Sequence, residues 1–203
     1  MNRLKITLTT TLQRIKEAHS CTDGYRKLAK HLGGCESYGM DTEINLLTIL
    51  ESNGVQDMLW CLRCTVQDSR RTSSQLAIEF AAECLPIFEK HCQNDCRPRH
   101  AIDASRGYLA GAVTLDELKK AHASADAAAD AAAYAAYAAY AAHAAAAAYA
   151  AHAAAAAAAI YAYAAYAADA AAYAADAAAY ASYAAARSNA KLRQADIIRM
   201  VLS

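Results

Sequence analysis

Apolar residues recur every three or four positions along the first 110 residues, the spacing typical of amphipathic α-helices. Apolar positions within 12–19 predict a first short helix. Those within 25–32 predict a second, which Gly33 and Gly34 would end. We expect an all-α fold because only two prolines and seven glycines interrupt the chain.

Two further helices are predicted before residue 66. Asp41 and Thr42 are suited to cap a third helix, because their side-chain oxygens can accept the first free amide protons. The sequence Asn53-Gly54 would end it. Residues 55–65 then form the fourth.

The fifth helix has the strongest pattern. Thr72 and Gln75 have the spacing of a capping box. Pro86 predicts a kink or break near Glu83, because its ring clashes with the carbonyl four residues earlier. Apolar residues three and four apart predict the buried face: Leu76, Phe80, Cys84, Ile87 and Phe88.

A sixth helix should begin near Asp95, whose carboxylate can accept amide protons, with Pro98 in the first turn. Its predicted core residues are Ala101, Ile102, Ser105 and Leu109. Gly111 should stop it. Thr114 and Glu117 form a second capping-box pattern, which opens the next helix.

Residues 121–186 are an alanine-rich tract without proline or glycine, which predicts helix because alanine is the best helix former. One rod of this length would extend roughly 100 Å at 1.5 Å per residue. We therefore expect the tract to fold back as a helical hairpin. The turn is predicted near residues 144–160, where the polar residues lose their phase.

Ten of the 13 tyrosines lie in this tract, and many share a helix face with aspartates. Such a face could stack planar ligands on its rings and bind polar groups with its carboxylates. It could equally fill gaps between alanine-rich helices and keep the surface hydrated. The candidate binding residues on it are Asp126, Asp130, Tyr134, Tyr137, Tyr166, Asp169, Tyr173, Asp176 and Tyr180.

A second candidate site is the arginine cluster of the sixth helix. Guanidinium groups suit phosphate or carboxylate ligands, which makes Arg97, Arg99 and Arg106 candidate binding residues together with Asp103. The alternative is that they pair with Glu79, Glu83 and Asp103 and hold two helices together. If those pairs were buried, losing one partner would cost about 3–5 kcal/mol.

Composition excludes several classes of function. Lys and Arg together number 20, as do Asp and Glu, so no net charge attracts nucleic acid or an anionic membrane. No apolar run reaches the roughly 20 residues of a transmembrane helix. The N-terminus lacks the apolar core of a signal peptide. We therefore expect a cytoplasmic protein.

The seven cysteines are an odd number and are predicted to be reduced thiols. Cys61 and Cys64 have the spacing of half a zinc site, and Cys92, Cys96 and His100 form a second cluster. An apolar helical context favours packing cysteines, so we predict no metal and no cofactor. No nucleophile with a supporting base and no glycine-rich phosphate loop is found, so we predict no enzymatic activity.

Several motifs resemble, in order, the Imm-five-like family of immunity proteins of bacteria and phages. They are residues 81–90 (AAECLPIFEK), 95–99 (DCRPR) and 101–106 (AIDASR), followed by the alanine-rich tract and 196–199 (DIIR). The resemblance covers about residues 56–202, and residues 21–25 resemble an attached leader. Cys92, Cys96 and Asp103 depart from the family pattern.

The resemblance implies an all-helical binding protein of bacterial or phage conflict systems. Residues 1–54 would form an N-terminal helical leader segment and residues 55–203 the family domain. Such a protein would sequester a toxin or a host-defence protein, as an immunity or anti-defence inhibitor. Two alternatives stay open: a sponge for a nucleotide-like immune signal, and a structural module that self-associates into a homo-oligomer.

Overall fold

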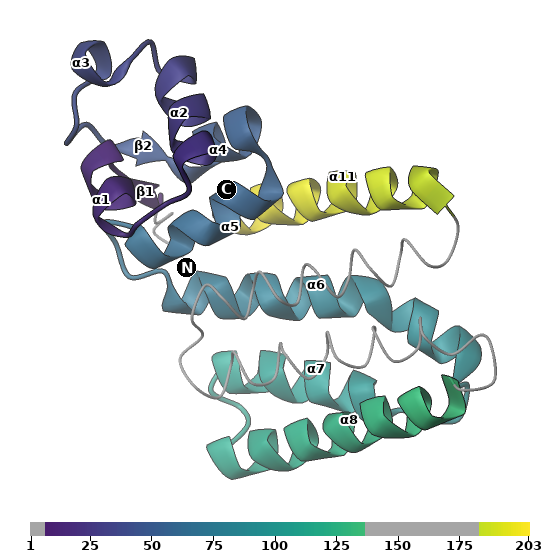
Figure 1. The fold of residues 1–203 in the computed structure, drawn as a ribbon. Helices are drawn as coiled ribbons and strands as arrows, with labels where there is room; N and C mark the ends of the chain where they lie inside the picture. The colour runs from purple at the N-terminus through teal and green to yellow at the C-terminus, as the bar shows by residue number, and fades with distance from the viewer. Residues whose placement is uncertain (1–6, 137–182) are drawn as a thin grey trace.

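A computed structural model describes residues 7–136 and 183–203 of the chain. The described part is mostly helical, as the spacing of apolar residues predicts, with one two-stranded sheet near the N-terminus (Figure 1). The predicted hairpin turn in the alanine tract lies outside the described residues. None of the described helices is long and apolar enough to cross a membrane.

The N-terminal segment combines short helices with that sheet. Thr10 pairs with Ile44 and Thr9 with Asn45 in an antiparallel register. The first two predicted helices are confirmed, whereas the short helix Cys35–Tyr38 was not predicted. The elements are β1 (Thr9–Thr10), α1 (Leu12–Glu17), α2 (Thr22–His31), α3 (Cys35–Tyr38) and β2 (Ile44–Asn45).

The next helices are α4 (Leu46–Asn53) and α5 (Val55–Cys61), followed by the 3-10 turn η1 (Leu62–Cys64). The predicted cap at Asp41 and Thr42 is wrong, because the Thr42 hydroxyl donates to the Tyr38 carbonyl instead. Asn45 caps α4, its side-chain oxygen accepting from the Leu47 amide at 2.8 Å. Gly54 ends α4 as predicted, at a φ of 99° that glycine adopts without strain.

Helix α6 (Arg70–His91) starts before the predicted capping box. The Asp68 carboxylate accepts from the Arg70 amide at 3.0 Å, so Thr72 lies inside the helix. Pro86 does not break α6, although its ribbon bends toward the C-terminal end (Figure 1). Of the predicted core residues, Leu76, Phe80, Cys84 and Phe88 are buried.

Helices α7 (Arg97–Leu109) and α8 (Leu115–Ala136) form an antiparallel pair below α6 (Figure 1). The predicted capping box is confirmed: the Thr114 backbone amide donates to the Glu117 carboxylate at 2.8 Å, and Glu117 donates its amide to the Thr114 hydroxyl. Small residues allow the two helices to pack closely. Ala101, Leu118 and Ala125 are buried together in one apolar cluster between them.

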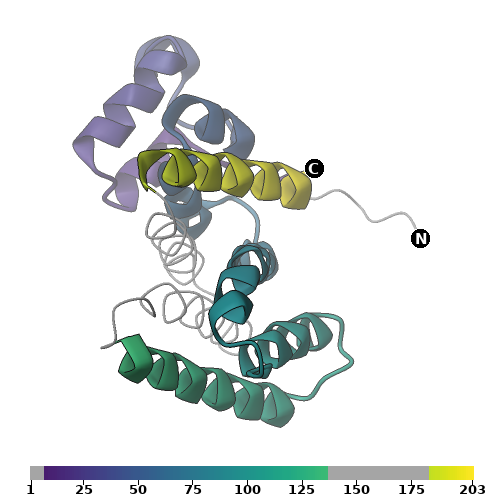
Figure 2. The same ribbon diagram turned by 90° about the vertical axis from the view of Figure 1, so that its right-hand side faces the viewer.

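The last helix, α11 (Tyr183–Leu202), packs against α4, α5 and α6. Figure 2 shows it crossing the N-terminal helices, with α6, α7 and α8 following below. Ile198 of α11 is buried in one apolar cluster with Leu12, Leu59 and Phe80. A single core therefore joins the C-terminal helix to the N-terminal segment.

Candidate partner-binding face

The arginine cluster is placed by the start of α7. The Asp95 carboxylate accepts from the Arg97 backbone amide at 3.1 Å, as predicted, and Pro98 occupies the first turn. The Arg97 guanidinium also donates to both Asp95 oxygens, at 2.9 and 2.6 Å. This side-chain hydrogen bond from Arg97 lowers the pKa of Asp95. The contacts of Arg97 with Asp95 therefore stabilise the start of α7.

Arg99 joins α7 to α6. Its Nε and Nη2 donate to the two carboxylate oxygens of Glu89, each at 2.7 Å. A two-point contact of this kind holds the guanidinium plane in one orientation. The Arg99 side chain is 53% exposed, so water reaches the pair. Its partner is Glu89, six residues beyond the Glu83 that was considered from the sequence.

Arg106 makes the second link between these helices. Its Nη2 donates to Glu79 of α6 at 3.0 Å, and its Nη1 lies 3.8 Å from Asp103. Both partners are among those considered from the sequence. The Asp103 side chain is 61% exposed and is the most exposed member of the cluster. The face thus alternates positive and negative groups, which we call the α6–α7 charge ladder (Arg99, Glu89, Arg106, Glu79 and Asp103).

A further ion pair was missed from the sequence, because Arg193 lies 110 positions after its partner. The Arg193 guanidinium of α11 donates to Glu83 Oε1 of α6. Within the described part of the chain, Glu83 Oε2 is buried and has no hydrogen-bond partner. Burial of the adjacent Cys84 raises the pKa of its thiol to about 12. The ion pair between Arg193 and Glu83 therefore joins α11 to α6.

The tyrosine and aspartate face is described only in part. Asp126 is half-buried on α8. The backbone of α8 also includes Asp130 and Tyr134. The remaining candidates lie outside the described residues, namely Tyr137, Tyr166, Asp169, Tyr173, Asp176 and Tyr180.

All seven cysteines are free thiols. Cys61 and Cys64 are buried in the core, where the Cys64 thiol donates to the Cys61 carbonyl at 3.4 Å. Cys96 Sγ lies 3.8 Å from His100 Nδ1. In the two described stretches, no three His, Cys, Asp or Glu side chains form a group that could hold a metal ion.

The family model described as "Imm-5 like putative immunity protein" matches residues 63–200, about two thirds of the chain. The chain belongs to this family. The match begins within η1, so α6, α7, α8 and the whole charge ladder lie in the Imm-5 like part, whereas α1 to α5 precede it. No curated protein and no solved structure matches the chain.

Proposed function

We propose that this Imm-5 like protein is a non-enzymatic immunity or anti-defence protein that binds a toxin or defence protein and blocks it. Membership of the family carries the proposal. An immunity protein needs a surface that recognises its target, and the α6–α7 charge ladder is the candidate surface on the matched residues.

The ladder has the properties of a recognition surface. Its side chains of α7 are about half exposed or more: Arg99 53%, Arg106 45% and Asp103 61%. The ion pairs hold the charged groups in fixed places before a partner arrives, which lowers the entropy cost of binding. Alternating charges select a complementary partner and speed its encounter. We therefore propose that Asp103 and Arg99 contact the target.

The same geometry favours a protein target over a nucleotide-like signal. Each of the three arginines has a carboxylate partner, and Arg99 already uses two donors on Glu89. A phosphate group would have to displace those carboxylates and would meet their negative charge. A protein surface can instead dock on the pairs as they stand. The sponge alternative becomes an outcome of the test.

The test is a survival assay with a panel of bacterial toxin domains and phage-defence proteins, each co-expressed with the protein. The proposal predicts protection against at least one, and a complex with it in size-exclusion chromatography. Asp103→Lys should abolish both, because it reverses the most exposed charge of the ladder. Asp41→Lys is the matched control, an exposed charge reversal outside the family match.

Two results would overturn the proposal. One is protection without a complex, accompanied by a bound nucleotide that mass spectrometry detects after denaturation. The other is protection that both lysine variants retain, because the charge ladder would then have no part in recognition.

A further inference from the structure

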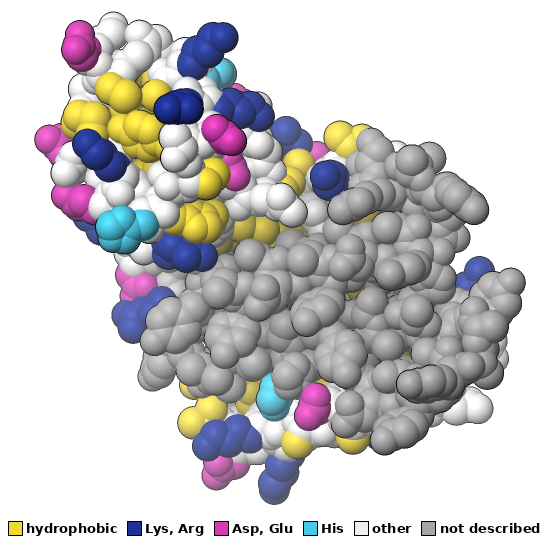
Figure 3. Space-filling view, viewed as in Figure 1, with side chains coloured by type: hydrophobic (Ala, Val, Ile, Leu, Met, Phe, Trp, Pro, Cys, Tyr) yellow, Lys and Arg dark blue, Asp and Glu magenta, His cyan; other side chains and the backbone are white. Residues whose placement is uncertain are grey.

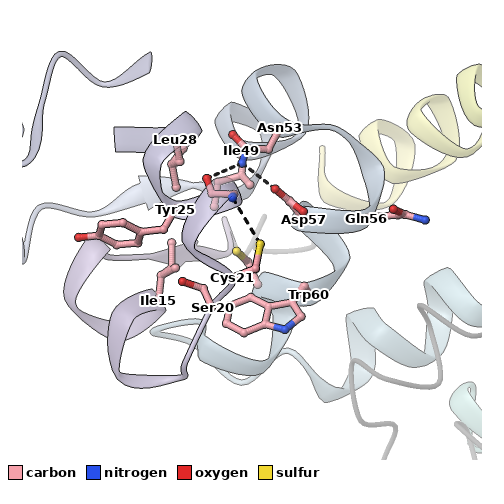
Figure 4. A pocket seen from close by; sticks show the side chains of 12 residues that line it. Ile15, Ser20, Cys21, Tyr25, Leu28, Ile49, Asn53, Gln56, Asp57 and Trp60 are labelled. Carbon is pink, nitrogen blue, oxygen red and sulfur yellow. Dashed lines mark hydrogen bonds between the residues drawn. The ribbon is translucent and has the colours of Figure 1, made fainter. Parts of the chain in front are cut away.

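A cavity of about 190 Å³ lies in the N-terminal segment, between α1, α2, α4 and α5 (Figure 4). None of the residues that line it belongs to the family match. The space-filling view shows apolar side chains gathered over these N-terminal helices, with charged groups around them (Figure 3). The cavity is therefore a separate feature from the charge ladder.

Most of the cavity wall is apolar. Ile15, Leu28 and Ile49 are buried side chains that line it, and the Trp60 indole forms another side (Figure 4). Tyr25 also lines it, and burial together with a hydrogen bond to the Cys35 thiol raises the pKa of its phenol to about 12. These walls suit an apolar body. A protein cavity of roughly 150 Å³ with such a lining can hold benzene.

One corner of the cavity is polar and negatively charged. The Asn53 amide donates to Asp57 Oδ2 at 2.7 Å and to the Gly24 carbonyl at 2.8 Å (Figure 4). Within residues 7–136 and 183–203, Asp57 forms no ion pair, and its Oδ1 accepts no hydrogen bond. A half-buried carboxylate with one free oxygen can accept a charged donor.

Gly24 leaves room for this carboxylate. A Cβ on Gly24 would lie 2.8 Å from Asp57 Oδ2 and 3.0 Å from Cys21 Sγ, so a larger residue would push the carboxylate away. Asn53 holds Asp57 from the other side. The Asn53 hydrogen bond therefore holds the carboxylate at the cavity, in the space that Gly24 leaves free.

We propose that this cavity binds a small organic ammonium ion whose apolar body, of the size of one aromatic ring, lies against Trp60 and Leu28. The ammonium group donates to Asp57 Oδ1. An anionic ligand is disfavoured because it would face the carboxylate. A neutral ligand of the same shape would gain the apolar contacts and could donate a hydrogen bond, but it would leave the carboxylate without a positive partner.

The chain provides its own reporter, since Trp60 is the single tryptophan. Its fluorescence is titrated with 2-phenylethylammonium and with neutral 2-phenylethanol. We expect saturable binding and at least a tenfold preference for the ammonium ion. Asp57→Asn should remove this preference, because the amide keeps the acceptor for Asn53 but loses the charge. Glu51→Gln, an exposed carboxylate of α4 away from the cavity, should keep it.

A second readout does not depend on fluorescence. Cys21 and Cys96 are both exposed thiols, but only Cys21 lines the cavity. Bound ligand should slow alkylation of Cys21 by iodoacetamide and leave Cys96 unchanged, as peptide mass spectrometry can measure. Non-saturable fluorescence changes, equal binding to folded Asp57→Asn, or an unprotected Cys21 would each overturn the inference.

Discussion

Removal of the two inter-helix arginines, by Arg99→Ala with Arg106→Ala, separates a structural from a recognition role of the charge ladder. Both ion pairs are partly exposed: Arg99 53% with Glu89 31%, and Arg106 45% with Glu79 26%. Exposed pairs contribute about 0.2–1 kcal/mol each to the free energy of unfolding. The carboxylates left behind stay in contact with water, so the cost of about 3–5 kcal/mol for a buried half-pair does not apply.

The expected loss for the double variant is therefore about 0.4–2 kcal/mol. In a chain of this size, 1 kcal/mol shifts the melting temperature by roughly 2–4 °C. The melting temperature should fall by about 1–8 °C, while protection in the survival assay is lost. The melting temperature is measured by circular dichroism during heating.

A double-mutant cycle checks the assignment of the pairs. Arg99→Ala, Glu89→Ala and their combination should give a coupling energy of about 0.5–1 kcal/mol. A coupling energy near zero would show that the pair contributes nothing. A fall of more than about 15 °C in the double arginine variant, with protection lost in proportion to unfolding, would refute the recognition role.

Three further predictions concern the fold. Thr114→Ala should cost about 0.5–2 kcal/mol in chemical denaturation because it removes the cap of α8, while Thr114→Ser should restore most of it. Ile198→Ala should cost about 2–5 kcal/mol because Ile198 of α11 is buried in the core. Met200 of the same helix is 62% exposed, so Met200→Ala should change stability little. Similar losses in the two variants would show that α11 does not close the core. Ionised Asp95 contributes to the free energy of unfolding of the wild-type protein, and this contribution should be lost below pH 4. The Asp95→Asn variant should lack it at every pH. The hydrogen bond from Arg97 lowers the pKa of Asp95, so its contribution is present above the unfolded value and is lost as pH falls through the folded one. Parallel stability–pH curves would contradict this.

Local signals in the sequence predicted much of the fold. The capping box of Thr114 and Glu117 spans four residues, and its hydrogen bonds form between neighbours whatever the rest of the chain does. The stop at Gly54 is equally local, since it depends on one backbone angle. Such features can be predicted from the sequence because the interacting groups are close together in it.

The errors and omissions come from contacts between distant positions. The cap at Asp41 and Thr42 was wrong because Ile44 and Asn45 pair with a strand 34 or more residues earlier, which shifts the start of α4. The partner of Glu83 is on the last helix. The cavity beside Trp60 is assembled from four helices, and no spacing in the sequence indicates it. The sequence indicated the charges on α7 as candidates and offered Glu79 and Asp103 as their partners, but the pairing of Arg99 with Glu89 required the structure.

We propose that this Imm-5 like protein acts by occupying its target. The most direct measurement is the residual activity of a purified target toxin or defence protein as the protein is titrated against it, above the dissociation constant of the complex. We predict that inhibition rises linearly and is complete at a fixed ratio near one chain per target, and that Asp103→Lys abolishes it. Complete inhibition at a small fraction of that ratio would show turnover, and would contradict the claim.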